Sequence, residues 1–95
     1  MNSDDDYREV LKRLDEIISI HSRKESDEVD IEEAMNILRD VLVYCNNMSR
    51  IRSVQLSQVA DNVSAIRRAL NSPSGEVNYS YTSQNISNLS TYCGI

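Results

Sequence analysis

The sequence predicts an all-α protein, either a helical hairpin or a three-helix bundle with coiled-coil-like packing, followed by a polar C-terminal tail. Residues 1–72 contain neither glycine nor proline, and these residue types appear only at Pro73, Gly75 and Gly94. Because glycine and proline interrupt helices, three quarters of the chain is free to be helical. The chain has no phenylalanine or tryptophan, so aliphatic side chains must form its core. Its 95 residues suffice for one domain.

The first helix is predicted over residues 4–23. Ser3 is a favourable N-cap residue, and Asp6 stands three residues later, where the acid of a capping box belongs. Side chains suited to one buried face then recur every three or four residues. They are Tyr7, Val10, Leu11, Leu14, Ile17, Ile18 and His21. Arg23 places positive charge at the end of the helix, where the helix dipole is negative.

A second helical segment is predicted over residues 30–71, because Asp30 and Glu33 repeat the capping pair. Its apolar face has two halves. The first consists of Ile31, Met35, Leu38, Leu42 and Cys45, and the second of Leu56, Val59 or Ala60, Val63, Ile66 and Leu70. Residues 46–52, between the halves, include asparagine and serine, which are weak helix formers. Two alternatives therefore stay open: one continuous helix, or two helices with a break near 46–52.

The chain divides into a helical domain, residues 1–72, and a tail, residues 73–95. Pro73 and Gly75 end the helical part, since proline cannot continue a helix and glycine accepts the left-handed cap geometry. Over residues 77–82, valine and tyrosine alternate with polar residues, which is the pattern of a short strand. The remainder is rich in serine and asparagine. We expect the tail to be partly disordered or extended, or to order against the helices or a neighbouring subunit.

The length of the second segment predicts self-association. As one helix it would be about 60 Å long, twice the length of the first helix, at a rise of 1.5 Å per residue. Its second half would then be uncovered unless the chain folds back as a third helix. A dimer is the favoured solution, because two-fold symmetry is the commonest way to bury a surplus face. The predicted contact residues are Met48, Ile51, Leu56, Val59, Val63, Ile66 and Leu70.

These features predict a non-enzymatic module for protein–protein interaction or assembly, which self-associates through an apolar helix face and has a partner protein as a further option. His21 is the sole histidine, and no nucleophile stands at a spacing that it could serve. No cofactor and no metal are expected. Two cysteines, Cys45 and Cys93, are too few for a disulfide framework, and Cys45 is predicted to be a small buried hydrophobe.

Two alternative functions depend on charge. A DNA-associated regulator would use Arg50, Arg52, Arg67 and Arg68, although a net charge of -5 makes nucleic acid an unfavourable partner. An inhibitor or decoy would instead use an acidic face to occupy the nucleic-acid-binding surface of a target. That face would consist of Asp4, Asp5, Asp6, Asp15 and Glu16.

The remaining sequence signals concern location. No apolar run approaches the roughly 20 residues that span a bilayer, and the acidic N-terminus is unlike a signal peptide. A cytoplasmic protein without membrane contact is expected. Asn-x-Ser triplets at Asn78, Asn85 and Asn88 are interpreted as chance products of the tail's composition. In size and acidic helical character the chain resembles small assembly, chaperone or inhibitor proteins of viruses and of bacterial secretion systems.

Overall fold

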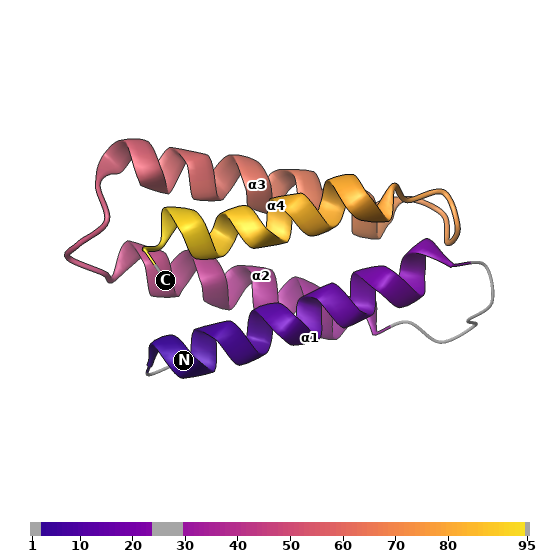
Figure 1. Cartoon of the computed structure of the whole chain (residues 1–95), viewed down its shortest axis with the longest axis horizontal. Helices are drawn as coiled ribbons and strands as arrows, with labels where there is room; N and C mark the ends of the chain where they lie inside the picture. Colours follow the sequence, from indigo (N-terminus) through magenta and orange to yellow (C-terminus); the bar gives the residue numbers. More distant parts are fainter. Residues whose placement is uncertain (1–2, 24–29, 95) are drawn as a thin grey trace.

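A computed structural model describes residues 3–23 and 30–94, in which four helices pack as an up-down-up-down bundle (Figure 1). No strand occurs within these residues. The all-α class is therefore confirmed, with four helices in place of the expected two or three. The helices are α1 (Asp4–Ser22), α2 (Ile31–Asn46), α3 (Ser53–Asn71) and α4 (Tyr79–Tyr92).

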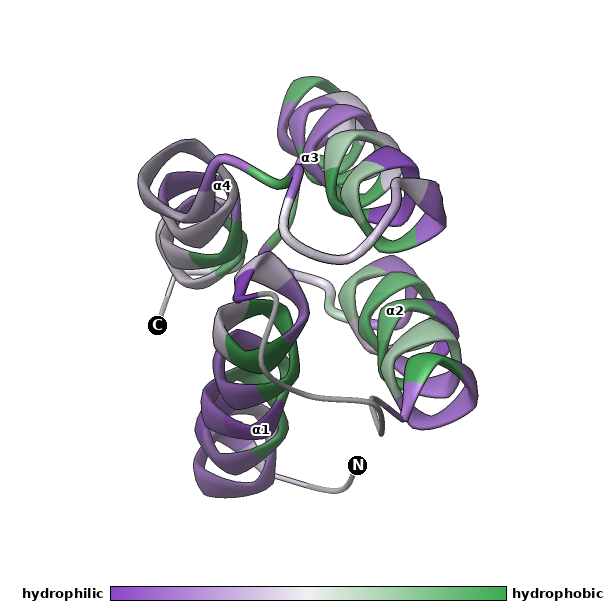
Figure 2. Ribbon diagram, turned by 90° about the vertical axis from the view of Figure 1, so that its right-hand side faces the viewer, coloured by the Kyte–Doolittle hydropathy of each residue, from purple (hydrophilic) through white to green (hydrophobic). Residues whose placement is uncertain are grey.

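The four helices enclose one aliphatic core. Viewed along the bundle, each helix turns its apolar side toward the centre, and α1 and α3 each lie between α2 and α4 (Figure 2). Every helix contributes fully buried side chains to this core. The largest of these are Tyr7, Leu14, Ile17, Ile18, Leu38, Ile66 and Leu89.

Side-chain caps define where three of the helices begin. Ser3 Oγ accepts a hydrogen bond from the backbone N–H of Asp6 at 3.2 Å, and Asp30 Oδ1 accepts one from Glu33 at 2.8 Å. Asn78 Oδ1 does the same for α4, accepting from the N–H of Tyr81 at 3.1 Å. Each cap satisfies a backbone donor that has no partner within its helix.

The second predicted segment is two helices. α2 ends at Asn46 and α3 begins at Ser53, so the break falls in the stretch of weak helix formers. The longest dimension of the molecule is 41 Å, shorter than the about 60 Å that one continuous helix would need. The chain reverses direction between α2 and α3, and the two halves of the long apolar face pack side by side.

Of the alternatives stated for the tail, ordering against the helices is the one observed, and the extended or disordered alternative is wrong. Residues 79–92 form α4, and the alternation of valine and tyrosine over residues 77–82 is not a strand. Thr82, Ile86, Leu89 and Cys93 are buried at spacings of three and four residues, the period of a helix. Contacts with the other helices, and not the weak helix propensity of serine and asparagine, make this segment helical.

The connection between α3 and α4 is attached to the end of α1. A carbonyl oxygen can only accept, so Nε2 of His21 donates to the carbonyl of Ser72 at 2.7 Å. The His21 carbonyl in turn accepts from the N–H of Gly75 at 2.9 Å. Gly75 has a φ of 85°, which glycine adopts without strain. His21 therefore has a packing and capping role here.

In the part of the chain that the structure describes, the helices lack the length and the apolar content needed to cross a bilayer.

Candidate functional site

The apolar face predicted for self-association lies inside the molecule. Val59, Val63, Ile66 and Leu70 are at most 3% exposed, because α2 and α4 flank α3 and cover this face. Leu56, Met48 and Ile51 are half-buried. The premise that this face stays uncovered within one chain, because the first helix is too short, is wrong, since α2 and α4 cover it.

The four arginines of the DNA-binding alternative do not converge. Arg50 and Arg52 belong to the connection before α3, whereas Arg67 and Arg68 lie in its last turns. About 15 residues of helix separate the two pairs, or about 22 Å along the bundle. Arg50 is also engaged within the chain, because its Nη2 donates to Asp4 at 3.0 Å.

The five residues of the acidic decoy face all interact within the chain. The ion pairs of Asp4, Asp5 and Glu16 with arginines reduce the negative charge that these three residues present to a basic target. The pairs with printed side-chain partners are Asp4 with Tyr44 and Arg50, Asp5 with Arg8, Asp15 with Tyr79 and Ser83, and Glu16 with Arg13.

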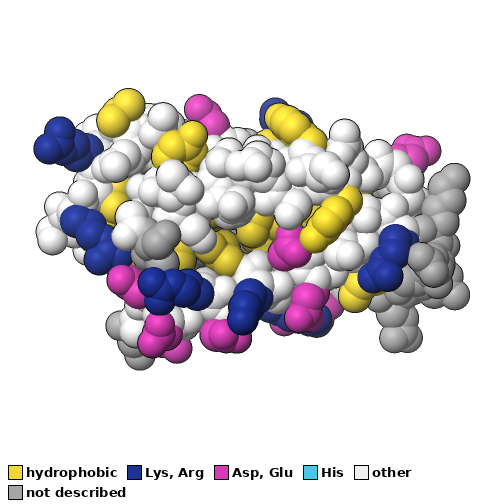
Figure 3. All heavy atoms as spheres, viewed as in Figure 1, with side chains coloured by type: hydrophobic (Ala, Val, Ile, Leu, Met, Phe, Trp, Pro, Cys, Tyr) yellow, Lys and Arg dark blue, Asp and Glu magenta, His cyan; other side chains and the backbone are white. Residues whose placement is uncertain are grey.

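The most distinctive surface is the outer side of α4. None of the 14 residues of this helix is charged, although the chain as a whole is 26% charged. Figure 3 shows uncharged side chains over α4 and charged side chains gathered along α1 below it. Tyr81 stands out on this side with 62% exposure. We define the α4 face as the exposed residues Ser80, Tyr81, Gln84, Ser87 and Thr91.

The start of α4 is attached to α1 by one carboxylate. Asp15 accepts hydrogen bonds from the Tyr79 hydroxyl at 2.7 Å and from Ser83 Oγ at 2.9 Å. The carboxylate stabilises the protonated phenol, which raises the pKa of Tyr79. A single aspartate in the middle of α1 thus fixes the position of the first turn of α4.

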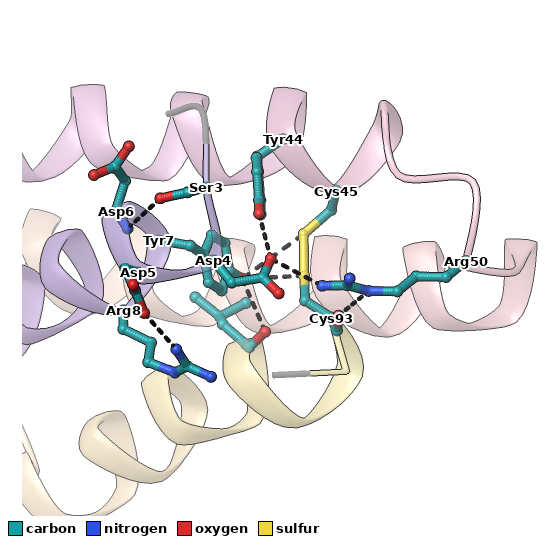
Figure 4. Close-up of polar contacts among 11 residues, drawn as sticks. Ser3, Asp4, Asp5, Asp6, Tyr7, Arg8, Tyr44, Cys45, Arg50 and Cys93 are labelled. Carbon is teal, nitrogen blue, oxygen red and sulfur yellow. Dashed lines mark hydrogen bonds and ion pairs between the residues drawn. A yellow bond between two sulfur atoms is a disulfide. The ribbon is translucent and has the colours of Figure 1, made fainter.

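The end of α4 is held by three groups from other elements (Figure 4). Cys93, which caps the helix, forms a disulfide with Cys45 at the end of α2. The Tyr7 hydroxyl donates to the carbonyl of Leu89 at 2.8 Å, and Nε of Arg50 donates to the carbonyl of Cys93 at 3.3 Å. These donors satisfy carbonyls that a helix end leaves unpaired. Cys45 is buried as predicted, but it is half of a disulfide, which the cysteine count did not lead us to expect.

Asp4 is the centre of a second group of contacts beside the disulfide. It accepts from the Tyr44 hydroxyl and from Arg50, and both interactions favour the charged carboxylate (Figure 4). The Tyr44 hydrogen bond, followed by that of Arg50, holds the pKa of Asp4 below its usual value. Desolvation raises the pKa of the buried phenol of Tyr7, which packs against the ring of Tyr44. The cluster joins α1, α2 and α4 at one end of the bundle.

A groove between α1 and α4 has a volume of about 640 Å³ and opens to solvent. Its floor includes Leu11 and Ile86, and one wall is formed by hydroxyls of α4. The α1 wall carries both signs of charge, from Arg8 and Lys12 to Asp15 and Glu16. Because both signs of charge line the groove, its electrostatics favour neither an anionic nor a cationic ligand, and we assign it none. The groove borders the α4 face.

Stability is expected to fall in acid through two paired carboxylates. Arg13 lowers the pKa of Glu33, as Tyr44 and Arg50 lower that of Asp4. The unfolded pKa values are 4.5 for Glu33 and 3.8 for Asp4, and the folded values are lower. Each carboxylate therefore stabilises the fold at pH values above its unfolded pKa. This stabilisation is lost as the pH falls through the folded pKa. Urea unfolding over a pH series checks this: Glu33→Gln should flatten the acid dependence, and Glu32→Gln, an exposed neighbour, should not. Equal acid dependence in all three proteins would contradict the expectation.

Comparison of the chain with protein-family models, with curated proteins and with solved structures gives no match. The surface must therefore be interpreted from its own chemistry.

Sequence reasoning allowed at most one or two turns of weak helix in this segment, from the spacing of Ile86, Leu89 and Tyr92, and missed both attachments of α4. One available signal was Asn78, a good N-cap residue, followed by Thr82, Ile86, Leu89 and Cys93 at helical spacing. The asparagines of the Asn-x-Ser triplets also serve the helix: Asn78 caps it, Asn85 is buried, and Asn88 donates to Asn62 of α3 at 3.1 Å.

Proposed function

We propose that the protein is a non-enzymatic protein–protein interaction module in which two copies meet through the α4 face. The observation that supports this most is the absence of charge from a helix whose outer side is exposed. A charged group loses hydration when a contact covers it, whereas hydroxyl, amide and phenol groups lose less and can exchange hydrogen bonds with a partner. The proposal therefore depends on the contrast between a helix without charged residues and a chain that is 26% charged.

A second copy is the partner that the charge distribution favours. Each chain carries a net charge of -5, and α1 holds six acidic against three basic residues. α2 is also acidic, with three acids and one base. Two copies that met through α1 or α2 would therefore repel one another, whereas α4 brings no charge to a symmetric contact. Tyrosine contributes large contact area at low entropic cost, which makes Tyr81 the expected anchor.

The contact is expected to be weak. α4 is about 21 Å long by its rise per residue, and pairing along one helix buries less than the roughly 1,200 Å² of a stable interface. The flanking groove and the neighbouring edge of α3 add contact area, but the interface stays in the small, weak class. A concentration-dependent dimer, dissociated when dilute, is the expected behaviour.

Sedimentation velocity over a concentration series tests the proposal with a matched pair of variants. Tyr81→Asp places a negative charge in the α4 face of both copies and should leave only monomer. Val43→Asp adds the same charge at a side chain of α2 that is 59% exposed, and should dimerise as the wild type does. A wild type that stays monomeric at the highest concentration would overturn the proposal. So would a loss of the dimer in Val43→Asp alone.

Location and biological role are part of the same proposal. We propose the cytoplasmic location that the sequence predicts, where thiols are kept reduced until an oxidant forms the disulfide. We propose a small accessory role in an assembly, like that of the viral and secretion-system proteins that the chain resembles in size and charge.

A further inference from the structure

We propose that formation of the Cys45–Cys93 disulfide converts residues 79–92 from an unattached segment into the docked helix α4, so that oxidation controls the α4 face. This regulation rests on the proposed function, since it acts on the same surface. The reduced chain would keep α1, α2 and α3 and would lose the surface through which copies meet.

The composition of α4 makes it a conditional helix. Nine of its 14 residues are serine, threonine or tyrosine, and it contains no alanine, glutamate, lysine, arginine or methionine. Isolated helices shorter than about 12–15 residues are marginal even when they are rich in alanine. With most positions disfavouring the helix, α4 exists only because it is held against the bundle.

The packing of α4 on the bundle is itself weakened by polar groups. Its buried side contains only two large aliphatic residues, Ile86 and Leu89, together with Thr82 and Asn85. Asn85 is 8% exposed, and its Nδ2 lacks a hydrogen-bond partner among the described residues. A buried donor without a partner opposes docking. α4 therefore docks with less intrinsic stability than its length suggests.

The disulfide adds to the stability of the docked state of α4, which packing alone leaves low. Cys93 lies at the very end of α4 and Cys45 at the end of α2, and the bond links positions 48 residues apart in the sequence. When α4 is detached and α1, α2 and α3 stay folded, the flexible part of the loop between these cysteines is residues 72–93, so the bond favours the docked state by about 10²- to 10³-fold in the chain-entropy model. Asp15 holds the first turn of α4 and the disulfide holds the last.

The chemistry is a balanced thiol–disulfide exchange. The thiolate of one cysteine attacks a sulfur of a small-molecule disulfide such as oxidised glutathione, which releases one glutathione and leaves a mixed disulfide. The second cysteine attacks that bond, the Cys45–Cys93 bond forms and the second glutathione leaves. The protein loses two electrons and two protons, and the oxidant becomes two thiols.

The closed state protects its own bond. Both cysteines are at most 1% exposed, and the Tyr7 hydroxyl lies 3.1 Å from Sγ of Cys93. A reducing thiolate can reach either sulfur only after the last turn of α4 opens. Once formed, the bond is expected to persist until the helix end opens.

Hydrogen exchange followed by mass spectrometry tests the switch on dilute protein, where no dimer forms. Reduction with a phosphine should lower amide protection in residues 79–92 by about 10²- to 10³-fold. Protection of α1 and α2 should change far less. The double variant Cys45→Ala, Cys93→Ala should behave as the reduced wild type does and should not respond to the phosphine, which controls for effects of the reagent.

The outcomes separate this inference from the proposed function. Unchanged protection of α4 after reduction would overturn the switch, and so would an equal loss in all four helices, because the bond would then act on the whole fold. Sedimentation of oxidised and reduced protein completes the test. If the oxidised protein fails to dimerise while α4 still responds to reduction, the proposed function fails and the redox-dependent helix stands.

Discussion

Ile66→Asp is expected to unfold the protein. Ile66 is 0% exposed in the centre of the core, on the α3 face that α4 covers. An ionised carboxylate placed there has no cation to pair with, and burying such a charge costs several kcal/mol. A domain of this size has a total stability of about 5–10 kcal/mol, so most of it would be lost. Circular dichroism and urea unfolding measure the effect directly.

Ser64→Asp is the matched control for this variant. Ser64 lies on the same helix, two residues away, and is exposed. Its replacement should change stability by no more than about 0.5 kcal/mol, as surface substitutions usually do. A folded Ile66→Asp protein that merely changed its state of association would contradict the structure, because it would place Ile66 between copies.

Tyr7→Ala is expected to destabilise the protein by about 3–5 kcal/mol, the usual effect of truncating a buried aromatic side chain. Tyr7 is fully buried where α1, α2 and α4 meet, and its ring stacks on Tyr44 at 5.0 Å between centroids. The truncation removes packing from the end of the bundle that carries the disulfide. Urea unfolding under non-reducing conditions measures the loss.

Tyr7→Phe separates the ring from the hydroxyl. It keeps the packing but removes the donor to the Leu89 carbonyl, so we expect a loss of about 1–2 kcal/mol. Equal losses in the alanine and phenylalanine variants would show that the hydroxyl carries the whole effect. No loss in either variant would contradict the buried position of Tyr7.

The first helix illustrates what can be predicted reliably. Ser3 and Asp6 mark its start, and Tyr7 through His21 repeat at the spacing of one face. All these signals lie within about 20 residues and agree with one another. When local signals agree in this way, tertiary packing rarely changes the secondary structure of the segment.

The candidate site, on α4, could not be predicted from local signals. The helix propensity of residues 79–92 is poor, and their alternation at 77–82 favours a strand, so local signals predict a tail. The contacts that hold α4 come from Asp15, Tyr7 and Cys45, which lie between 48 and 86 positions away from their partners in the sequence. No local pattern reveals which distant groups will meet. For the same reason the sequence predicted that a second copy covers the α3 face, although its cover lies in the segment interpreted as a polar tail.

The sequence by itself determined the all-α class, the limits of the first helix and the aliphatic character of the core, because periodicity, capping and the absence of glycine and proline act over a few turns of chain. The tertiary structure decided the fourth helix, the burial of Val59, Val63 and Ile66, and the pairing of the two cysteines. These features depend on free energy gained between segments that are far apart along the chain. Such contacts can stabilise a helix that local preference alone would leave unfolded.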